Sequence, residues 1–152
     1  MTATAAVTLG VLGRPVSGAS ESRSVTGRTV DSMAKVMVVD DAKSELKLIE
    51  GILKTAGHEV VCFPDGEELE ERVVLERPDL LLLDIVMPHR NGYEILRSLK
   101  RDERTRAMPV VLVSSKNQES DRVWGKRQGA DEYLGKPFTA EQLLEAVRRF
   151  AR

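Results

Sequence analysis

The sequence has one cysteine, a net charge close to zero and no long apolar segment. Each of these features argues against a class of structure or function. A single cysteine cannot form a disulfide within the chain, and Cys62 lies in the apolar run 60–63, so we predict a small core residue without a redox role. A formal net charge of −1 gives no field that would attract nucleic acid or an anionic membrane. No apolar stretch approaches the roughly 20 residues of a membrane-spanning helix. Together these features favour a cytoplasmic protein.

The first 32 residues differ from the remainder of the 152-residue chain. They are rich in Ala, Thr, Ser, Gly and Val and show no sustained period, so we predict a disordered tail. Alternatively the native chain starts at Met33, which leads directly into the first predicted strand. A secretory signal is disfavoured because no basic region precedes the mildly apolar segment 5–12. Residues 33–152 are long enough for one domain with a proper core.

From Lys35 onward, strand patterns and helix patterns alternate without a break. Strands are expected at 36–40, 59–63, 80–84, 110–113 and 132–134. Helices are expected at 42–55, 93–101, 119–128 and 140–151, with an acidic helix after Gly66 that turns Leu69, Val73 and Val74 inward. Gly57 should end the first helix, and Thr139 with Gln142 should cap the last one. This alternation predicts the α/β class, with one five-stranded, parallel, doubly wound sheet.

Polar residues follow four of these apolar strands. Because right-handed crossovers place all the carboxyl ends of parallel strands at one edge of the sheet, residues far apart in the chain should meet there. The residues at those ends are Asp40 and Asp41, Asp84, Ser114 and Ser115, and Lys136. The run of four leucines before Asp84 is typical of a strand that is buried on both faces.

Three carboxylates at one sheet edge repel one another unless a cation lies among them. Mg²⁺ suits such an oxygen-rich site, and it also binds phosphate oxygens. Lys136 can pair with a phosphoryl oxygen, and the Ser114 hydroxyl can donate to another. With that charge offset, Asp84 can act as a nucleophile on phosphorus and form an aspartyl phosphate. Each element alone has an ordinary interpretation, such as a helix N-cap or a turn, and the prediction depends on their joint arrival at one edge.

The order Asp-Asp, Asp-x-x-Met-Pro-x-x-x-Gly, Ser, Lys-Pro closely resembles the receiver domain of two-component response regulators over residues 35–152. The resemblance implies the CheY-like, flavodoxin-like (βα)5 fold, phosphorylation by a histidine kinase (CheA-like or another), and Mg²⁺ as the cofactor. It implies these roles: phosphoacceptor Asp84; metal ligands Asp40, Asp41, Asp84 and the Val86 main-chain carbonyl; phosphoryl-stabilising Lys136 and Ser114; switch residues Ser114 and Tyr133.

A finer resemblance covers residues 115–130, which look like the PilH type of single-domain regulator from chemosensory systems of type IV pili and twitching motility. The resemblance implies a cytoplasmic phosphorelay protein, monomeric or weakly dimeric, whose only chemistry is self-phosphorylation and autodephosphorylation. On phosphorylation Ser114 and Tyr133 should move inward. Since the chain ends at Arg152 without space for an output domain, the output should be a protein contact, or the domain should act as a phosphate sink.

Several residues refine this interpretation. Trp124, Lys126 and Tyr133 are candidates for the output surface, although for Trp124 a half-buried packing role is favoured. Gly125 inside a predicted helix costs roughly 1 kcal/mol relative to Ala, which suggests a packing reason. Gly135 stands where the family often has Thr, and Val86 is apolar where some receivers are polar. We therefore expect Val86 and Lys116 to influence the lifetime of the phosphoryl group.

Other classes fit less well. An aspartate-based phosphatase of the haloacid dehalogenase type needs Asp-x-Asp, and the second position after Asp84 is Val86. A P-loop hydrolase needs Gly-x-x-x-x-Gly-Lys-Ser/Thr, which the sequence lacks. In a flavodoxin-like electron carrier, Asp40 and Asp41 would repel the cofactor phosphate. His58 and His89 are expected to be surface residues and not ligands or general bases.

Overall fold

The computed structural model describes residues 33–151, so the predictions about the first 32 residues lie outside the described part of the chain. The strands are β1 (Lys35–Val39), β2 (Glu59–Phe63), β3 (Leu80–Asp84), β4 (Val110–Ser114) and β5 (Glu132–Gly135). The helices are α2 (Lys43–Thr55), α3 (Leu69–Glu76), α4 (Gly92–Arg101), α5 (Glu119–Arg127) and α6 (Ala140–Phe150). Within residues 33–151, no helix has both the length and the apolar composition needed to cross a bilayer.

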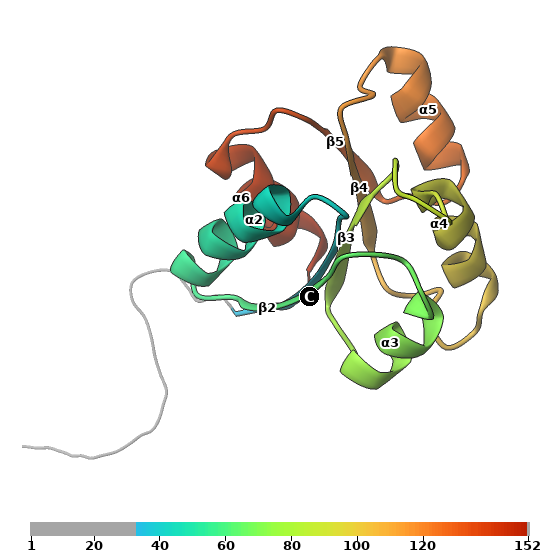
Figure 1. Cartoon of the computed structure of the whole chain (residues 1–152), viewed down its shortest axis with the longest axis horizontal. Helices are drawn as coiled ribbons and strands as arrows, with labels where there is room; N and C mark the ends of the chain where they lie inside the picture. Colours follow the sequence, from blue (N-terminus) through green and yellow to red (C-terminus); the bar gives the residue numbers. More distant parts are fainter. Residues whose placement is uncertain (1–32, 152) are drawn as a thin grey trace, which may run out of the picture. The chain divides into compact units, whose positions relative to one another are not determined.

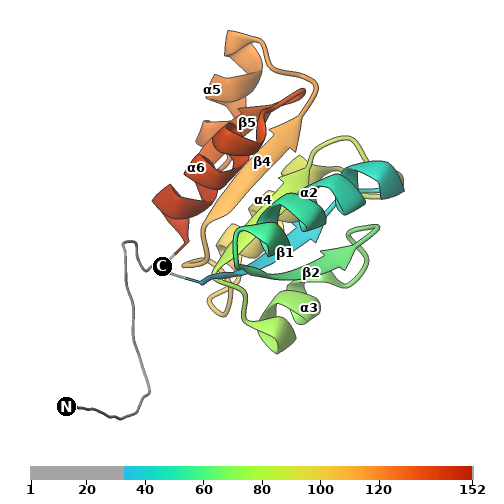
Figure 2. The same ribbon diagram turned by 90° about the vertical axis from the view of Figure 1, so that its left-hand side faces the viewer.

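All five strands form one parallel sheet in the order β2-β1-β3-β4-β5. Helices α2 and α6 cover one face, and α3, α4 and α5 cover the other (Figures 1 and 2). The predicted doubly wound α/β fold is therefore confirmed. The register pairs Val39 with Leu83, Asp84 with Val113, and Ser114 with Gly135, so the carboxyl ends of the strands lie level with one another.

The central strand β3 is buried at all five positions, as its leucine run predicts. Because successive side chains of a strand point to opposite faces, its leucines divide between two apolar clusters. Leu81 and Leu83 pack under α3 and α4, whereas Leu80 and Leu82 pack under α2 and α6. The end of β3 is thus held from both faces of the sheet.

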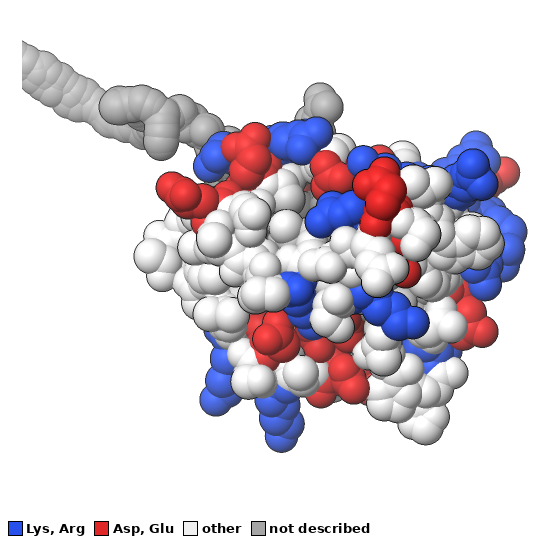
Figure 3. Space-filling view, turned by 90° about the horizontal axis from the view of Figure 1, so that it is seen from above, with Lys and Arg blue, Asp and Glu red and all other residues white. Residues whose placement is uncertain are grey.

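Most predicted boundaries agree with the structure to within one residue. Gly57 follows α2 with a φ of +96°, a left-handed conformation that glycine adopts without strain. The predicted cap of α6 is confirmed, with Thr139 Oγ1 accepting from Gln142 N at 3.0 Å and Gln142 Oε1 accepting from Thr139 N at 2.9 Å. Charged side chains of both signs are interspersed on the face drawn in Figure 3, in keeping with the small net charge.

Three local expectations need adjustment. Cys62 packs against the apolar cluster under α2 and α6, but it is only partly buried, because β2 is an edge strand with one neighbour. Leu69 and Val73 of α3 are buried, as predicted, but Val74 is only partly buried. His58 is also partly buried, and its Nδ1 accepts a hydrogen bond from the Ala34 amide at 3.1 Å.

We predict that replacing Leu96 on α4 destabilises the domain strongly, whereas replacing Leu75 on α3 does not. Leu96 is fully buried and Leu75 is 81% exposed. Leu96→Ala should lower the free energy of unfolding by about 2–5 kcal/mol through lost burial and a residual cavity. Leu75→Ala, the matched control, should change it by less than about 0.5 kcal/mol. Urea denaturation followed by circular dichroism measures both, and equal losses would contradict this placement of the core.

Candidate functional site

The ends of three strands supply the charged centre of the site. Asp40 follows β1, Asp84 ends β3, and Lys136 follows β5. The Lys136 ammonium lies 3.0 Å from Asp40 Oδ2 and 3.5 Å from Asp84 Oδ1. These contacts span 96 and 52 residues of sequence, so only the sheet topology brings them together.

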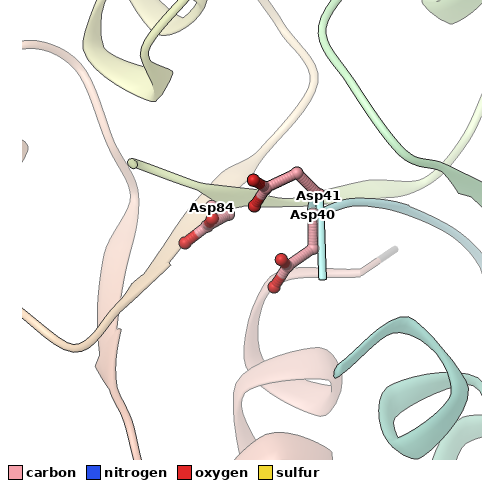
Figure 4. A group of neighbouring side chains, drawn as sticks. All are labelled: Asp40, Asp41 and Asp84. Carbon is pink, nitrogen blue, oxygen red and sulfur yellow. The ribbon is translucent and has the colours of Figure 1, made fainter. Parts of the chain in front are cut away.

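Three carboxylates surround this point. Asp40, Asp41 and Asp84 each offer an oxygen, and these oxygens lie within 4.8 Å of one another (Figure 4). Asp40 and Asp84 are 2% and 6% exposed, whereas Asp41 is exposed. The cluster therefore has two buried members and one that opens to solvent.

Asp40 has one contact in the chain turn and one in the site, but it is not the helix N-cap, a position that Ala42 holds without any side-chain cap. Its Oδ1 accepts a hydrogen bond from the Ala42 amide at 2.9 Å, just before the first turn of α2. Its Oδ2 pairs with Lys136. One oxygen thus fixes the turn that leads into the helix, and the other belongs to the charged site.

Burial, and after it the negative charge of Asp40, raise the pKa of Asp84 to about 6, even though Lys136 acts in the opposite direction. Burial lowers the pKa of Lys136, but its contacts with Asp40 and Asp84 outweigh that effect and the net shift is upward. Lys136 therefore stays a cation, yet one ammonium does not offset three carboxylates. The surplus negative charge and the all-oxygen donor set suit a hard divalent cation such as Mg²⁺.

Glu45 is a member of the site that the sequence did not indicate. Its Oε1 lies 3.7 Å from Lys136 Nζ, from the first turn of α2. An acidic residue in a first helical turn is ordinarily explained by the helix dipole, so the sequence pattern alone does not mark Glu45 as a site residue. The available signal was its place in the helix that directly follows Asp40 and Asp41.

Ser114 and Tyr133 lie inward beside the site. Ser114 is 1% exposed, and its Oγ accepts from the Lys116 amide at 3.1 Å. Tyr133 is 2% exposed, and its hydroxyl donates to the Lys116 carbonyl. Burial raises the pKa of Tyr133 to about 12. Tyr133 is thus buried in the unphosphorylated chain, and its movement on phosphorylation stays a prediction.

The candidate output surface needs a correction for the same reason. Tyr133 packs within the apolar cluster under α4 and does not contribute to the outer surface. Trp124 is 49% exposed, in line with the favoured half-buried role. Lys126 is exposed on the same helix, and its ammonium pairs with Glu132 at 3.1 Å.

The loop after Asp84 depends on one glycine and one arginine. The Gly92 amide donates to the Ile85 carbonyl at 2.7 Å, and a Cβ at Gly92 would lie 2.5 Å from the Asp84 carbonyl oxygen, so a side chain is excluded there. Arg90, which the sequence did not single out, binds both carboxylate oxygens of Glu70 at 3.2 and 2.7 Å. The loop is therefore fastened to the end of β3 and to α3.

Within this loop, the side chain of Val86 is 56% exposed, and His89 is also exposed, as predicted. Met87 is buried at 9% exposure. The Arg90 guanidinium holds the pKa of Glu70 at about 2, mainly through their hydrogen bonds. This ion pair therefore persists throughout the physiological pH range.

We predict that Asp84→Asn stabilises the metal-free protein, and more so at pH 8 than at pH 4. The folded pKa of Asp84, about 6, exceeds its ordinary value of 3.8, so the folded state favours the protonated acid. The protonated Asp84 carboxyl therefore contributes fully to the free energy of unfolding below about pH 4, and this contribution is lost as the pH rises through about 6. The advantage of Asp84→Asn at pH 8 should be of order 1–3 kcal/mol in denaturant titrations. An advantage that does not grow with pH would contradict the shifted pKa.

Comparisons with known proteins agree with this geometry. The profile described as the response regulator receiver domain matches residues 36–148. Protein PilH of Pseudomonas aeruginosa is 43% identical over 115 residues, which cover 76% of this chain and 95% of PilH. Chemotaxis protein CheY4 of Vibrio cholerae superposes with a TM-score of 0.72 at 30% identity, covering 78% of this chain and 99% of CheY4.

The receiver domain of the Francisella response regulator 1452 is similar as well, with a TM-score of 0.72 and 26% identity over 77% of this chain and 95% of that domain. The haloacid dehalogenase, P-loop and electron-carrier alternatives gain no support from these matches. The chain belongs to the response regulator receiver domain family and has its CheY-like fold.

Proposed function

We propose that this receiver domain accepts one phosphoryl group from a histidine kinase on Asp84. The observation that carries the proposal is the Lys136 ammonium, which lies 3.5 Å from an Asp84 oxygen inside a cluster of three carboxylates. A lysine in that position neutralises charge at the point where a phosphoryl group would arrive. Receiver domains are signalling domains, so the chemistry serves a switch and not the turnover of a metabolite.

Each residue of the site has its own role in the proposed phosphoryl transfer. An Asp84 oxygen attacks phosphorus, the bond between phosphorus and the donor nitrogen breaks, and the phosphoryl group becomes an acyl phosphate. Lys136 pairs with a phosphoryl oxygen, and the Ser114 hydroxyl donates to another. Water later breaks the new P–O bond, releasing inorganic phosphate and restoring the carboxylate.

Mg²⁺ is the proposed cofactor, held by Asp40, Asp41, Asp84 and the main-chain carbonyl of Val86. The carboxylate cluster supports this because its negative charge exceeds what Lys136 offsets. When bound, the ion would supply positive charge that balances both the carboxylates and the incoming phosphoryl group. The exposed Asp41 gives the side from which an ion can enter.

We further propose a place for the protein in a cytoplasmic chemosensory pathway that controls type IV pili and twitching motility. The support is the resemblance of residues 115–130 to the PilH type, together with 43% identity to Protein PilH. A CheA-like kinase would be the phosphodonor, and Ser114 with Tyr133 would report phosphorylation. The output would be a changed protein contact that includes Trp124 and Lys126, with a pure phosphate sink as the second candidate.

Incubation with a small phosphodonor and Mg²⁺ should add the mass of one phosphoryl group to the protein. Asp84→Asn should gain nothing, and omission of the divalent cation should greatly reduce the labelling, because the carboxylate cluster repels an anionic donor. Intact-mass spectrometry reads the result. Asp65→Asn is the matched control, because it keeps the acceptor atom of the turn bond to the Glu67 amide and lies outside the acidic cluster. Equal labelling of Asp84→Asn and Asp65→Asn would overturn the assignment of the phosphoacceptor.

We also predict that Val86→Asn shortens the lifetime of the phosphorylated form several-fold. The side chain of Val86 is 56% exposed next to the site, so a polar group there can orient the water that hydrolyses the acyl phosphate. Loss of phosphoryl mass with time, after removal of the donor, measures the rate. Leu75→Asn, an exposed apolar residue on α3, is the control. An unchanged rate in Val86→Asn would sink the prediction.

A further inference from the structure

The loop between β3 and α4 contains a backbone turn that a residue other than glycine adopts only at a cost. His89 has a φ of +72°, and the Arg90 amide donates to the Pro88 carbonyl at 2.8 Å, so these three residues form a γ-turn. The positive φ at its centre makes this the rare and strained form of the γ-turn. Such a conformation persists only where the surrounding structure holds it. The loop therefore depends on contacts made by its neighbouring residues.

Arg90, directly after the turn, makes those contacts. Its Nη1 donates to Glu70 Oε1 at 3.2 Å and its Nη2 to Glu70 Oε2 at 2.7 Å, so the ion pair is bidentate. Nη1 also donates to the Gly66 carbonyl at 3.0 Å. The hydroxyl of Ser98, on α4, donates to the same carboxylate. One ion pair thus joins the loop after β3 to α3, to α4 and to the loop after β2.

These contacts connect the two loops that flank the end of β1. In the sheet, β1 lies between β2 and β3, and Gly66 and Arg90 belong to the segments that follow these two neighbours. A Cβ at Gly66 would lie 2.2 Å from Ile95 Cδ1, so no side chain fits there and the backbone can pack against α4. The loop that follows Asp84 is therefore tied to its surroundings beside the strand that carries the other two carboxylates of the site.

We propose that Arg90 and Glu70 are positioning residues that hold the loop after β3 in the conformation in which the Val86 carbonyl can bind Mg²⁺. The hydrogen bond from the Gly92 amide to the Ile85 carbonyl closes the base of this loop, and the ion pair fixes its tip. The role rests on the proposed Mg²⁺ site, whereas the ion pair itself is a contact of the metal-free chain.

Charge and positioning predict opposite effects of losing the arginine. Removing a cation from the neighbourhood of an acidic cluster makes the local potential more negative, so by charge alone Arg90→Met would strengthen Mg²⁺ binding. Loss of positioning would weaken it. Arg90→Lys keeps the charge but cannot form the bidentate pair, so it should weaken binding as well. The direction of the change in Arg90→Met therefore distinguishes the two effects.

Isothermal titration calorimetry of the full-length protein with Mg²⁺ alone measures the dissociation constant. Arg90→Met and Arg90→Lys should raise it roughly three- to tenfold. The matched control is Arg104→Met, which should leave it unchanged, because Arg104 also binds both carboxylate oxygens of a glutamate on α3, Glu71, at 3.3 and 2.8 Å, but lies outside this loop. Adding Glu70→Gln to Arg90→Met should cause little further loss, since the pair acts as a unit. An unchanged or lower dissociation constant in Arg90→Met would overturn the proposal.

Hydrogen exchange without any metal tests the ion pair by itself. Arg90→Met should raise deuterium uptake in segment 85–92 about twofold or more, while uptake in β4 stays at the wild-type level. Arg104→Met should leave both segments unchanged. Unchanged uptake in Arg90→Met, or uptake raised equally in β4, would overturn the proposal. If the wild type binds no Mg²⁺, the proposed cofactor site is overturned, and the exchange result still decides whether the ion pair holds the loop.

Discussion

The structure depends on the burial of two carboxylates with a single lysine at the end of a parallel sheet. Asp40 and Asp84 are almost inaccessible to water, and both contact the ammonium of Lys136. The desolvation cost raises the pKa of Asp84, and the nearby Asp40 adds to it. Apolar side chains of similar volume would stabilise the fold at least as well as this cluster, because buried charges rarely add stability. The arrangement suits the divalent cation and the phosphoryl group that we propose for this site, because both would change its charge balance.

The fold supplies the rigidity that this arrangement needs. Strand β3 is central and buried on both faces, so the position of Asp84 is fixed by the leucines before it. The following loop is held by the hydrogen bond between Gly92 and Ile85 and by the ion pair between Arg90 and Glu70. The carboxylates repel one another, and the surplus negative charge stays at one point only if they cannot move apart. These contacts hold the end of β3 and the loop after it in place.

Two hydroxyl groups beside the site bind the same residue of the loop after β4, since Ser114 Oγ accepts from the Lys116 amide and the Tyr133 hydroxyl donates to the Lys116 carbonyl. Ser114 and Tyr133 are both buried, so neither can contact a partner directly in this conformation. At the surface, Tyr93 of α4 and the half-exposed Trp124 of α5 form an edge-to-face pair. The glycine of α5, Gly125, gives up helix propensity and thereby makes room for the ring of Tyr133.

The sequence by itself determined the alternation of strands and helices, the parallel sheet and the convergence of Asp40, Asp41, Asp84, Ser114 and Lys136. These follow from apolar periodicity and the handedness of crossovers, which are local or general rules. Only the tertiary structure decided that Glu45 reaches Lys136, that Arg90 pairs with Glu70, and that Tyr133 already lies inward. Those facts depend on side-chain reach and on the space between elements distant in sequence. The pattern along the chain predicts which strand ends lie together at the edge of the sheet. It does not predict which side chains from different elements contact one another there.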